Sequence, residues 1–162
     1  LMFLNVAAEL NQVYGSLSPT TQQSAPPKTE DDWVRRVANW DDATANVEIR
    51  QGLPIALVVR LQELLGLTGA QAARLIGRSR STYSRHRNQD KELGGPEAER
   101  AVRYARLLAL AAETLQFEDA AAWMQEPNRA LDDDTPLDMA ETDPGATMGR
   151  DLLLGVQHGF VL

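Results

Sequence analysis

The sequence predicts an all-α protein, and two observations lead to this prediction. Apolar residues recur at helical spacing in successive segments, and glycine, proline and capping side chains separate those segments. No stretch alternates apolar and polar residues over a length that would predict a strand. We therefore expect an N-terminal helix with a flexible linker over residues 1–30, a first helical domain over 31–95 and a second over 96–162.

The first segment of the chain has the pattern of a separate amphipathic helix. Apolar residues lie at mostly helical spacing from Met2 to Tyr14, and Gly15 ends the pattern. The polar, proline-bearing run Ser16–Lys28 then predicts a linker that buries little surface. The helix would pack on the rest of the chain or on a second copy, and a frayed or tag-derived end explains the pattern equally well.

Capping residues and helix breakers place the remaining helices in order. The expected helix starts are Asp31 or Asp32, Pro54, Thr68, Ser79, Glu97 and the pair Asp143-Pro144, and Pro136 opens one further turn. The expected stops are Gly52, Gly66, Gly77 and Pro127. Trp33 and Trp40 share a face of the first of these helices, which indicates packing in the core or in a dimer rather than a ligand site.

Charge is sorted along the chain more strongly than the net charge of −7 suggests. Between Thr68 and Lys91, six cationic side chains stand against one carboxylate. From Glu113 to the last residue, eleven carboxylates stand against two arginines. A basic island in an acidic chain is the footprint expected of a local nucleic-acid contact, although an arginine-rich solvated helix face would give the same pattern.

Residues 68–87 have the pattern of a helix-turn-helix. Ala73 supplies a small side chain where two helices cross, and Gly77 supplies a turn residue that tolerates positive φ. Arg80 and Arg85 are the candidates for base edges, because a forked guanidinium can pair with guanine, and the serines and Arg87 suit phosphates. The alternative is a helix pair that serves only as a scaffold. The expected DNA-binding residues are Ser79, Arg80, Ser81, Ser84, Arg85, Arg87 and Asn88.

Two positions depart from the usual helix-turn-helix pattern. Arg78 follows the turn glycine at a position that usually packs inward with an aliphatic side chain, and His86 takes another position where an apolar residue is expected. Either the helix pair is splayed slightly, or the two side-chain stems lie along the core with their polar heads in water.

From Ile49 onward the sequence resembles the Xre/MbcA/ParS group of antitoxins, which are partners of RES-domain toxins. The resemblance rests on the segments IRQGLPIALVVRLQELLGL, RSTYSRHR, ERAVRYARLLALAAETL and EPNRALDDDTPLDMAETDPG. Its most specific part joins Pro127-Asn128, Ala130-Leu131 and Thr135-Pro136-Leu137 to Thr142 and Gly145. It implies an Xre-like helix-turn-helix domain followed by a small helical toxin-binding domain, and it leaves the N-terminal helix and linker unsupported.

The resemblance also implies a function. The chain would be the antitoxin of a type II toxin–antitoxin system that blocks the active site of a NAD-consuming RES toxin and represses its own operon. Its last residues would enter the nucleotide pocket as a plug. The apolar chain end agrees with a partner surface, although such a tail can also fold back on its own core. The implied toxin-binding residues are Asn128, Arg129, Leu153, Val156, His158, Gly159, Phe160, Val161 and Leu162.

The chain departs from the family pattern at two places. Asp132-Asp133 replaces a pair that is often two glycines, which would change a turn. Gly155 stands where members often carry a longer polar or basic residue, which would remove a toxin contact.

The acidic residues between Asp132 and Asp143 would complement a toxin cleft that holds pyrophosphate, because such clefts are lined with cations.

The expected partners are a RES-domain toxin and operator DNA, with a homodimer inside a hetero-oligomeric complex and with no cofactor or metal. The chain has no cysteine, which excludes disulfides and cysteine nucleophiles and fits a cytoplasmic location. No apolar run approaches the roughly 20 residues that span a bilayer, so we expect no membrane association.

An enzyme is the less favoured interpretation. His86 and His158 are the only histidines, and the sequence has no nucleophile elbow, phosphate-binding loop or zinc-protease motif. The three consecutive aspartates at 132–134 lack the glycine and distal glutamate of a calcium loop. The more serious alternative is a stand-alone helix-turn-helix repressor with no toxin partner, whose C-terminal domain dimerises or senses a ligand.

Overall fold

A computed structural model of the chain describes residues 32–115 and 117–159. The helix and linker expected over residues 1–30 lie outside the described residues, as do the last three residues. The described part is helical, which confirms the predicted fold class. Its helices are α2 (Asp32–Ala38), α3 (Asp42–Gln51), α4 (Ala56–Leu64), α5 (Gly69–Leu75), α6 (Arg80–Asn88), α7 (Gly95–Leu115), α8 (Phe117–Gln125), the 3-10 turn η1 (Arg129–Leu131), α9 (Pro136–Met139) and α10 (Asp143–Gln157).

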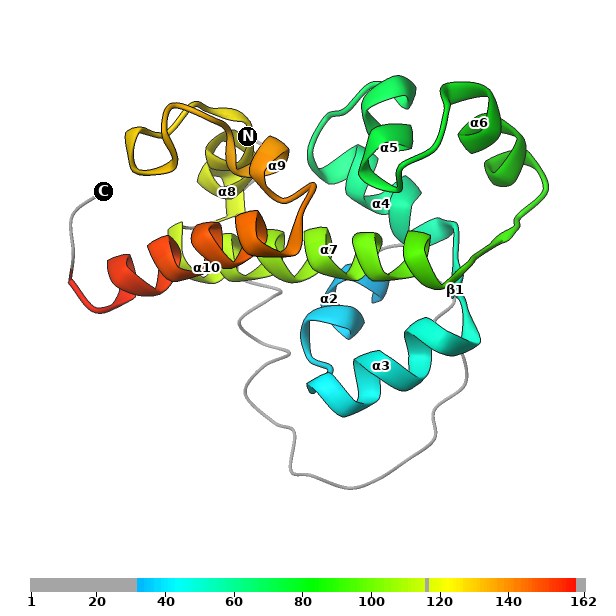
Figure 1. The fold of residues 1–162 in the computed structure, drawn as a ribbon, viewed down its shortest axis with the longest axis horizontal. Coiled ribbons are helices and arrows are strands. Elements are labelled where there is room, and N and C mark those ends of the chain that lie inside the picture. Colours follow the sequence, from blue (N-terminus) through cyan, green and yellow to red (C-terminus); the bar gives the residue numbers. More distant parts are fainter. Residues whose placement is uncertain (1–31, 116, 160–162) are drawn as a thin grey trace, which may run out of the picture.

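The long helix α7 runs through the middle of the molecule and organises the other helices around it (Figure 1). The helices α4, α5 and α6 cover one end of α7, and α8, α9 and α10 cover the other end. The helices α2 and α3 lie below it in this view. Because α7 contacts α2, α3, α4 and α5 as well as α8 and α10, it is shared between the two domains predicted from the sequence.

Small side chains on α7 allow its neighbours to approach closely. Ala98, Ala101, Ala105 and Ala111 are all fully buried, and Leu108 fills the wider gaps between them. Each buried leucine stabilises the fold by about 2 kcal/mol relative to an exposed one. The helical spacing of apolar residues predicts an inner face of Ala101, Val102, Tyr104, Ala105, Leu108 and Ala112, and all of these are buried except Ala112, which is partly buried.

A short pair of strands is the first correction to the sequence-based prediction. The strands β1 (Leu53–Pro54) and β2 (Glu92–Leu93) pair antiparallel, with Leu53 opposite Leu93 and Pro54 opposite Glu92. Two residues are too few to show alternation, so no sequence pattern could indicate them. Both leucines are 1% exposed, so the pair buries them, and β1 lies beside the start of α7 (Figure 1).

Three predicted helix starts are also wrong by one or two residues. The helix α7 begins at Gly95 rather than Glu97. Pro54 belongs to β1, and α4 begins at Ala56 without a side-chain cap. The cap of α10 is Thr142 rather than Asp143-Pro144, because the Thr142 hydroxyl accepts a hydrogen bond from the Gly145 amide at 3.2 Å. Asp143 then occupies the first turn, where a carboxylate favours the positive end of the helix.

The two tryptophans near the start of the described chain pack against the core while staying partly exposed. Trp33 and Trp40 are half-buried, and the guanidinium carbon of Arg36 lies 5.2 Å from the centre of the Trp33 ring. The core interpretation of this pair is therefore supported.

Among the described helices, none is long and apolar enough to cross a membrane.

Candidate nucleic-acid interface and partner surface

Local capping signals build the α5–α6 pair as predicted. The Thr68 hydroxyl accepts from the Gln71 amide at 3.2 Å while the Gln71 side chain accepts from the Thr68 amide at 2.9 Å. Gly77 ends α5 with φ of 67°, a left-handed conformation that favours glycine. The Ser79 hydroxyl accepts from the Thr82 amide at 3.2 Å and starts α6. These contacts confirm Thr68 and Ser79 as caps.

The inner face of α6 is fixed by two aromatic side chains. Tyr83 and His86 are buried, with exposed fractions of 2% and 6%. The Tyr83 hydroxyl donates to Oε1 of Gln62 at 2.7 Å, which ties α6 to α4. Because these residues face inward, the opposite face of α6 is left to solvent.

The outer face of α6 carries the residues predicted to contact DNA. All seven are exposed, six of them on α6 and Ser79 at its cap. Arg80, Ser84 and Arg87 lie in one row along the helix, and Ser81, Arg85 and Asn88 lie beside them, as helical periodicity requires. Their role in DNA binding stays a prediction.

Arg78, one of the two departures from the helix-turn-helix pattern, pairs with a buried carboxylate. Glu97, in the first turn of α7, forms an ion pair with Nε of Arg78 and accepts from the Gly94 amide at 3.0 Å. Burial raises the pKa of Glu97, but the hydrogen bonds from Arg78 and Gly94 and the neighbouring charges outweigh it and hold the pKa below its ordinary value. Arg78, His86 and Glu97 line one hollow, whose volume is about 440 Å³.

Sequence reasoning missed Glu97, although two signals pointed to it. It follows Gly94-Gly95-Pro96 at the start of a helix, where a glutamate commonly accepts from the backbone. The unexpected Arg78 also needed a nearby negative partner. The expectation that both polar heads lie in water is wrong for His86, which is only 6% exposed, whereas half of the Arg78 side chain is exposed.

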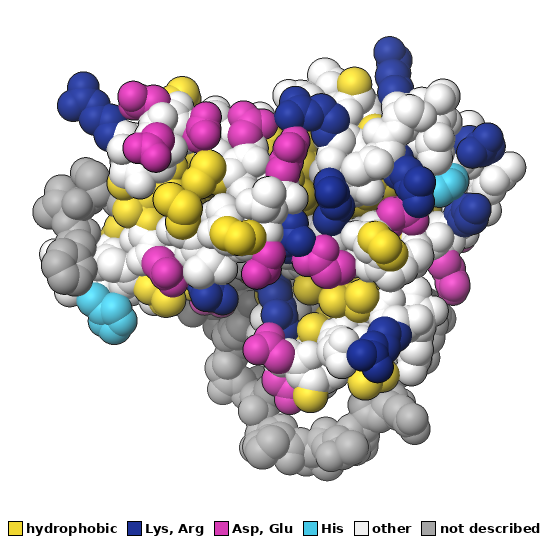
Figure 2. All heavy atoms as spheres, viewed as in Figure 1, with side chains coloured by type: hydrophobic (Ala, Val, Ile, Leu, Met, Phe, Trp, Pro, Cys, Tyr) yellow, Lys and Arg dark blue, Asp and Glu magenta, His cyan; other side chains and the backbone are white. Residues whose placement is uncertain are grey.

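Charge is divided between the two ends of the molecule. Figure 2 shows lysine and arginine side chains spread over the α5–α6 end and acidic side chains over the α8–α10 end. The basic side chains at the first end include those of the outer face of α6. The sorting of charge along the sequence therefore becomes a sorting of charge in space.

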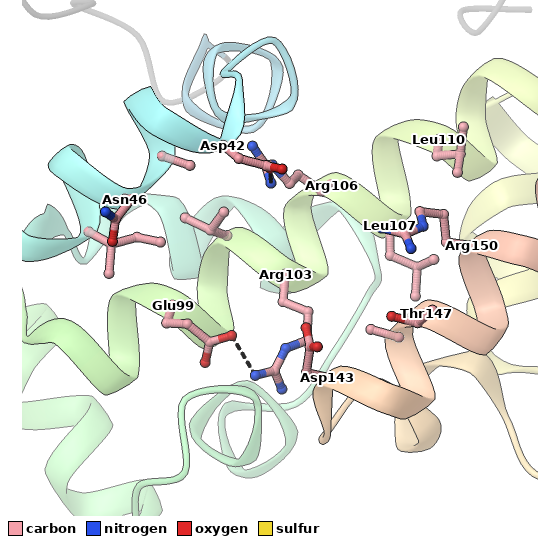
Figure 3. Close-up of a pocket in the computed structure, with 14 residues that line it drawn as sticks. Asp42, Asn46, Glu99, Arg103, Arg106, Leu107, Leu110, Asp143, Thr147 and Arg150 are labelled. Carbon is pink, nitrogen blue, oxygen red and sulfur yellow. Dashed lines mark hydrogen bonds and ion pairs between the residues drawn. The ribbon is translucent and has the colours of Figure 1, made fainter.

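A groove of about 290 Å³ lies between α3, α7 and α10 (Figure 3). Two of the arginines that line it, Arg103 and Arg106, have structural partners. Arg106 donates to Asp42 at 2.9 Å and to the Trp40 carbonyl at 2.7 Å. Arg103 pairs with Glu99, as the dashed line in the figure marks. Arg103 also donates to the Ala140 and Glu141 carbonyls, so these two arginines hold α7 to the surrounding chain. Arg150, which also lines the groove, keeps 56% of its side chain exposed.

The last helix combines a buried side with a partly exposed apolar side. Leu153 is a correction to the predicted toxin-binding set, because its side chain is fully buried in the core and supports the fold. Val156 is half-buried, and His158 and Gly159 are exposed after the helix ends at Gln157. The remaining predicted contacts, Phe160, Val161 and Leu162, lie outside the described residues.

The loop before α9 is held by a predicted site residue. The Asn128 side chain accepts from the Ala130 amide at 2.9 Å, so Asn128 shapes the loop, while Arg129 is exposed. Asp132 and Asp133 have φ of 56° and 64°. They thus keep the left-handed backbone that glycine prefers, and the turn is built without glycine.

Comparison with known sequences identifies the family. The sequence model of the antitoxin Xre-like helix-turn-helix domain matches residues 45–106, and that of the antitoxin Xre/MbcA/ParS C-terminal toxin-binding domain matches residues 116–159. Together they cover more than half of the chain. The chain belongs to the Xre/MbcA/ParS family of antitoxins. It is 28% identical over 118 residues to Antitoxin Xre of Photorhabdus laumondii subsp. laumondii, covering 72% of this chain and 80% of the relative.

A second relative gives the same picture. Antitoxin Xre of Yersinia enterocolitica is 25% identical over 113 residues, which cover 68% of this chain and 76% of the relative. The antitoxin therefore has a helix-turn-helix domain that implies DNA binding and a C-terminal domain that implies a toxin partner. Membership of an antitoxin family indicates a binding protein rather than an enzyme.

Polar contacts join the helix-turn-helix of the antitoxin to its toxin-binding domain, and two of them are short hydrogen-bonded contacts. Arg74 of α5 pairs with Glu141, between α9 and α10, at 2.8 Å. Nε2 of Gln125, at the end of α8, donates to the Leu65 carbonyl at 2.8 Å. Sequence patterns could not indicate these contacts, because each joins residues at least 60 positions apart.

Proposed function

We propose that this antitoxin blocks the active site of a NAD-consuming RES-domain toxin with its C-terminal end and represses its own operon through α6. It acts as a homodimer within a hetero-oligomeric complex. The observation that carries the proposal is the division of the molecule into a basic α6 face and an acidic end formed by α8 to α10. One end suits the DNA backbone, and the other suits a cleft built for an anionic nucleotide.

The end of α10 supports the toxin-blocking half of the proposal. Leu152, Leu154 and Val156 are each only half-buried, so the helix keeps apolar surface available as it leaves the core. The chain then continues through exposed Gly159, where an added Cβ would meet nothing within 4 Å. A partly exposed apolar helix that leads into an apolar tail is a surface for a protein partner.

Co-purification tests the proposal against a stand-alone repressor. The antitoxin and the product of the adjacent reading frame are co-expressed with a tag on the antitoxin alone, and the mass of the eluted complex is measured by light scattering. We expect a stable complex that contains two antitoxin chains. A repressor without a toxin would elute alone and still retain DNA from upstream of its own reading frame.

Arg80→Ala is expected to weaken operator binding by about 1 to 3 kcal/mol, because it removes a candidate base contact. Arg87→Ala should instead weaken binding to all sequences alike and flatten the salt dependence, as loss of a phosphate contact does. Fluorescence anisotropy with operator and scrambled duplexes, each at several salt concentrations, separates the two effects. Unchanged operator affinity in an Arg80→Ala/Arg85→Ala double variant would remove the recognition role from α6.

Deletion of Leu1–Lys28 is expected to leave toxin neutralisation intact, since both family matches begin after this segment. Inhibition of the toxin by the truncated and full chains gives the comparison, and light scattering shows whether the segment changes the oligomeric state. Loss of toxin binding in the truncated chain, with its thermal unfolding unchanged, would show that the segment takes part in neutralisation.

A further inference from the structure

Glu97 is a buried acid that the proposed function does not use. The residue is 5% exposed, and its two carboxylate oxygens are occupied by Arg78 and by the Gly94 amide. A carboxylate is buried at considerable cost unless it is paired and hydrogen-bonded. The contacts around Glu97 therefore have to keep one arrangement, and any element that supplies a contact is held in place.

Arg78 connects this carboxylate to the start of α6. It lies directly between Gly77, whose φ of 67° makes the turn, and Ser79, whose hydroxyl caps the helix. The ion pair with Glu97 thus fixes the backbone at the point where α6 begins. A shift of Arg78 would move Ser79 and the first turn of α6 with it.

His86 brings the last turn of α6 to the same place. It is 6% exposed, and its Nδ1 is buried without a hydrogen-bond partner in the structure. His86, Arg78 and Glu97 line one hollow between α6 and the start of α7. Arg78 contacts Glu97 directly at the start of α6, and His86 lines the same hollow from the last turn of α6. The two α6-side residues occupy the positions that a helix-turn-helix usually fills with apolar side chains, so a polar cluster replaces apolar packing here.

We propose that Glu97 is the positioning residue of the recognition helix: through its ion pair with Arg78 it sets the placement of the first turn of α6, so that selective DNA binding depends on its negative charge. The proposal rests on DNA binding by α6. Glu97 itself is buried and does not contact the DNA. Its effect is transmitted by the placement of the arginines on the outer face of α6.

A purely electrostatic role for Glu97 predicts the opposite result. Removal of a negative charge beside a basic helix makes the surface more positive and strengthens binding to every DNA sequence. A positioning role predicts weaker binding to the operator and no loss on a scrambled sequence. The ratio of the two affinities therefore distinguishes positioning from electrostatics, and neither outcome depends on the absolute affinity.

The test compares Glu97→Gln with Glu92→Gln on two duplexes of equal length. One duplex carries the DNA upstream of the antitoxin reading frame, and the other carries the same bases in scrambled order. Glu92 lines the same hollow but is exposed, so its variant removes a nearby charge without removing the contact to Arg78. We expect Glu97→Gln to lower the affinity ratio about tenfold, which is the discrimination of one bidentate arginine contact, and Glu92→Gln to leave it unchanged.

Amide hydrogen exchange of the free antitoxin tests the same role without DNA. Glu97→Gln should speed exchange in α6 and leave α10 protected, whereas exchange that rises in both helices indicates a general loss of stability and overturns the proposal. Wild-type antitoxin that fails to distinguish the duplexes refutes DNA recognition by α6. If Glu97→Gln changes neither the operator-to-scrambled affinity ratio nor the exchange in α6, the positioning role is refuted, while DNA recognition by α6 still stands.

Discussion

Gly145→Ala is expected to destabilise the antitoxin by about 3 kcal/mol or more, because the first turn of α10 has no space for a side chain. A Cβ at this position would lie 1.9 Å from the Met139 carbonyl oxygen and 2.7 Å from its carbonyl carbon. Both atoms belong to the backbone and cannot rotate away. The end of α9 and the start of α10 would have to separate, and the Thr142 cap would be disturbed with them.

Gly149→Ala is the matched control on the same helix. A Cβ there would lie 3.5 Å from the nearest atom, a methyl carbon of Leu107, which is ordinary van der Waals contact. Alanine is favoured over glycine inside a helix by roughly 0.5 to 1 kcal/mol, so this variant should be neutral or slightly more stable. Urea unfolding followed by circular dichroism measures both variants. Similar stabilities for the two would show that α9 and α10 do not approach as closely as the structure indicates.

Deletion of His158–Leu162 is expected to abolish toxin inhibition while leaving the fold intact. His158 and Gly159 are exposed, and Gly159 has no neighbour that a side chain would touch, so the folded core loses little. If Phe160 anchors the plug in the toxin, its loss alone removes at least about 2 kcal/mol of toxin affinity.

Three measurements on the truncated chain separate these effects: thermal unfolding, operator binding and inhibition of NAD turnover by the toxin. The first two should match the full chain, and they serve as the control for the third. Inhibition at full strength without the tail would assign neutralisation to the acidic surface around Asn128–Asp143 or to a conformational effect on the toxin.

The helix-turn-helix could be predicted because its signals are local. Thr68, Gly77 and Ser79 act on the backbone within a few residues of themselves, so their roles can be inferred from sequence. The same holds for the buried face of α7, which one periodic pattern encodes over a long helix. These are the parts of the fold in which local preference and tertiary packing agree.

The parts that could not be predicted depend on contacts between distant segments. Leu152, Leu153 and Leu154 are consecutive leucines, so the sequence cannot indicate which of them faces the core, and the structure buries Leu153. The pairing of Leu53 with Leu93 and the partner of Arg78 likewise arise only when the helices pack on α7. The predicted DNA-binding surface could therefore be inferred from local sequence patterns. The contact between Arg78 and Glu97 of α7, which supports that surface, could not.

The most direct test of the proposed function is the inhibition of NAD turnover measured at increasing NAD concentrations. The enzyme is the purified product of the adjacent reading frame, and the antitoxin is added at fixed concentrations. A chain end that occupies the nucleotide pocket predicts that high NAD concentration relieves inhibition and that NAD slows formation of the complex. Inhibition that is independent of NAD concentration, in a complex that still forms, would contradict a plug in the active site.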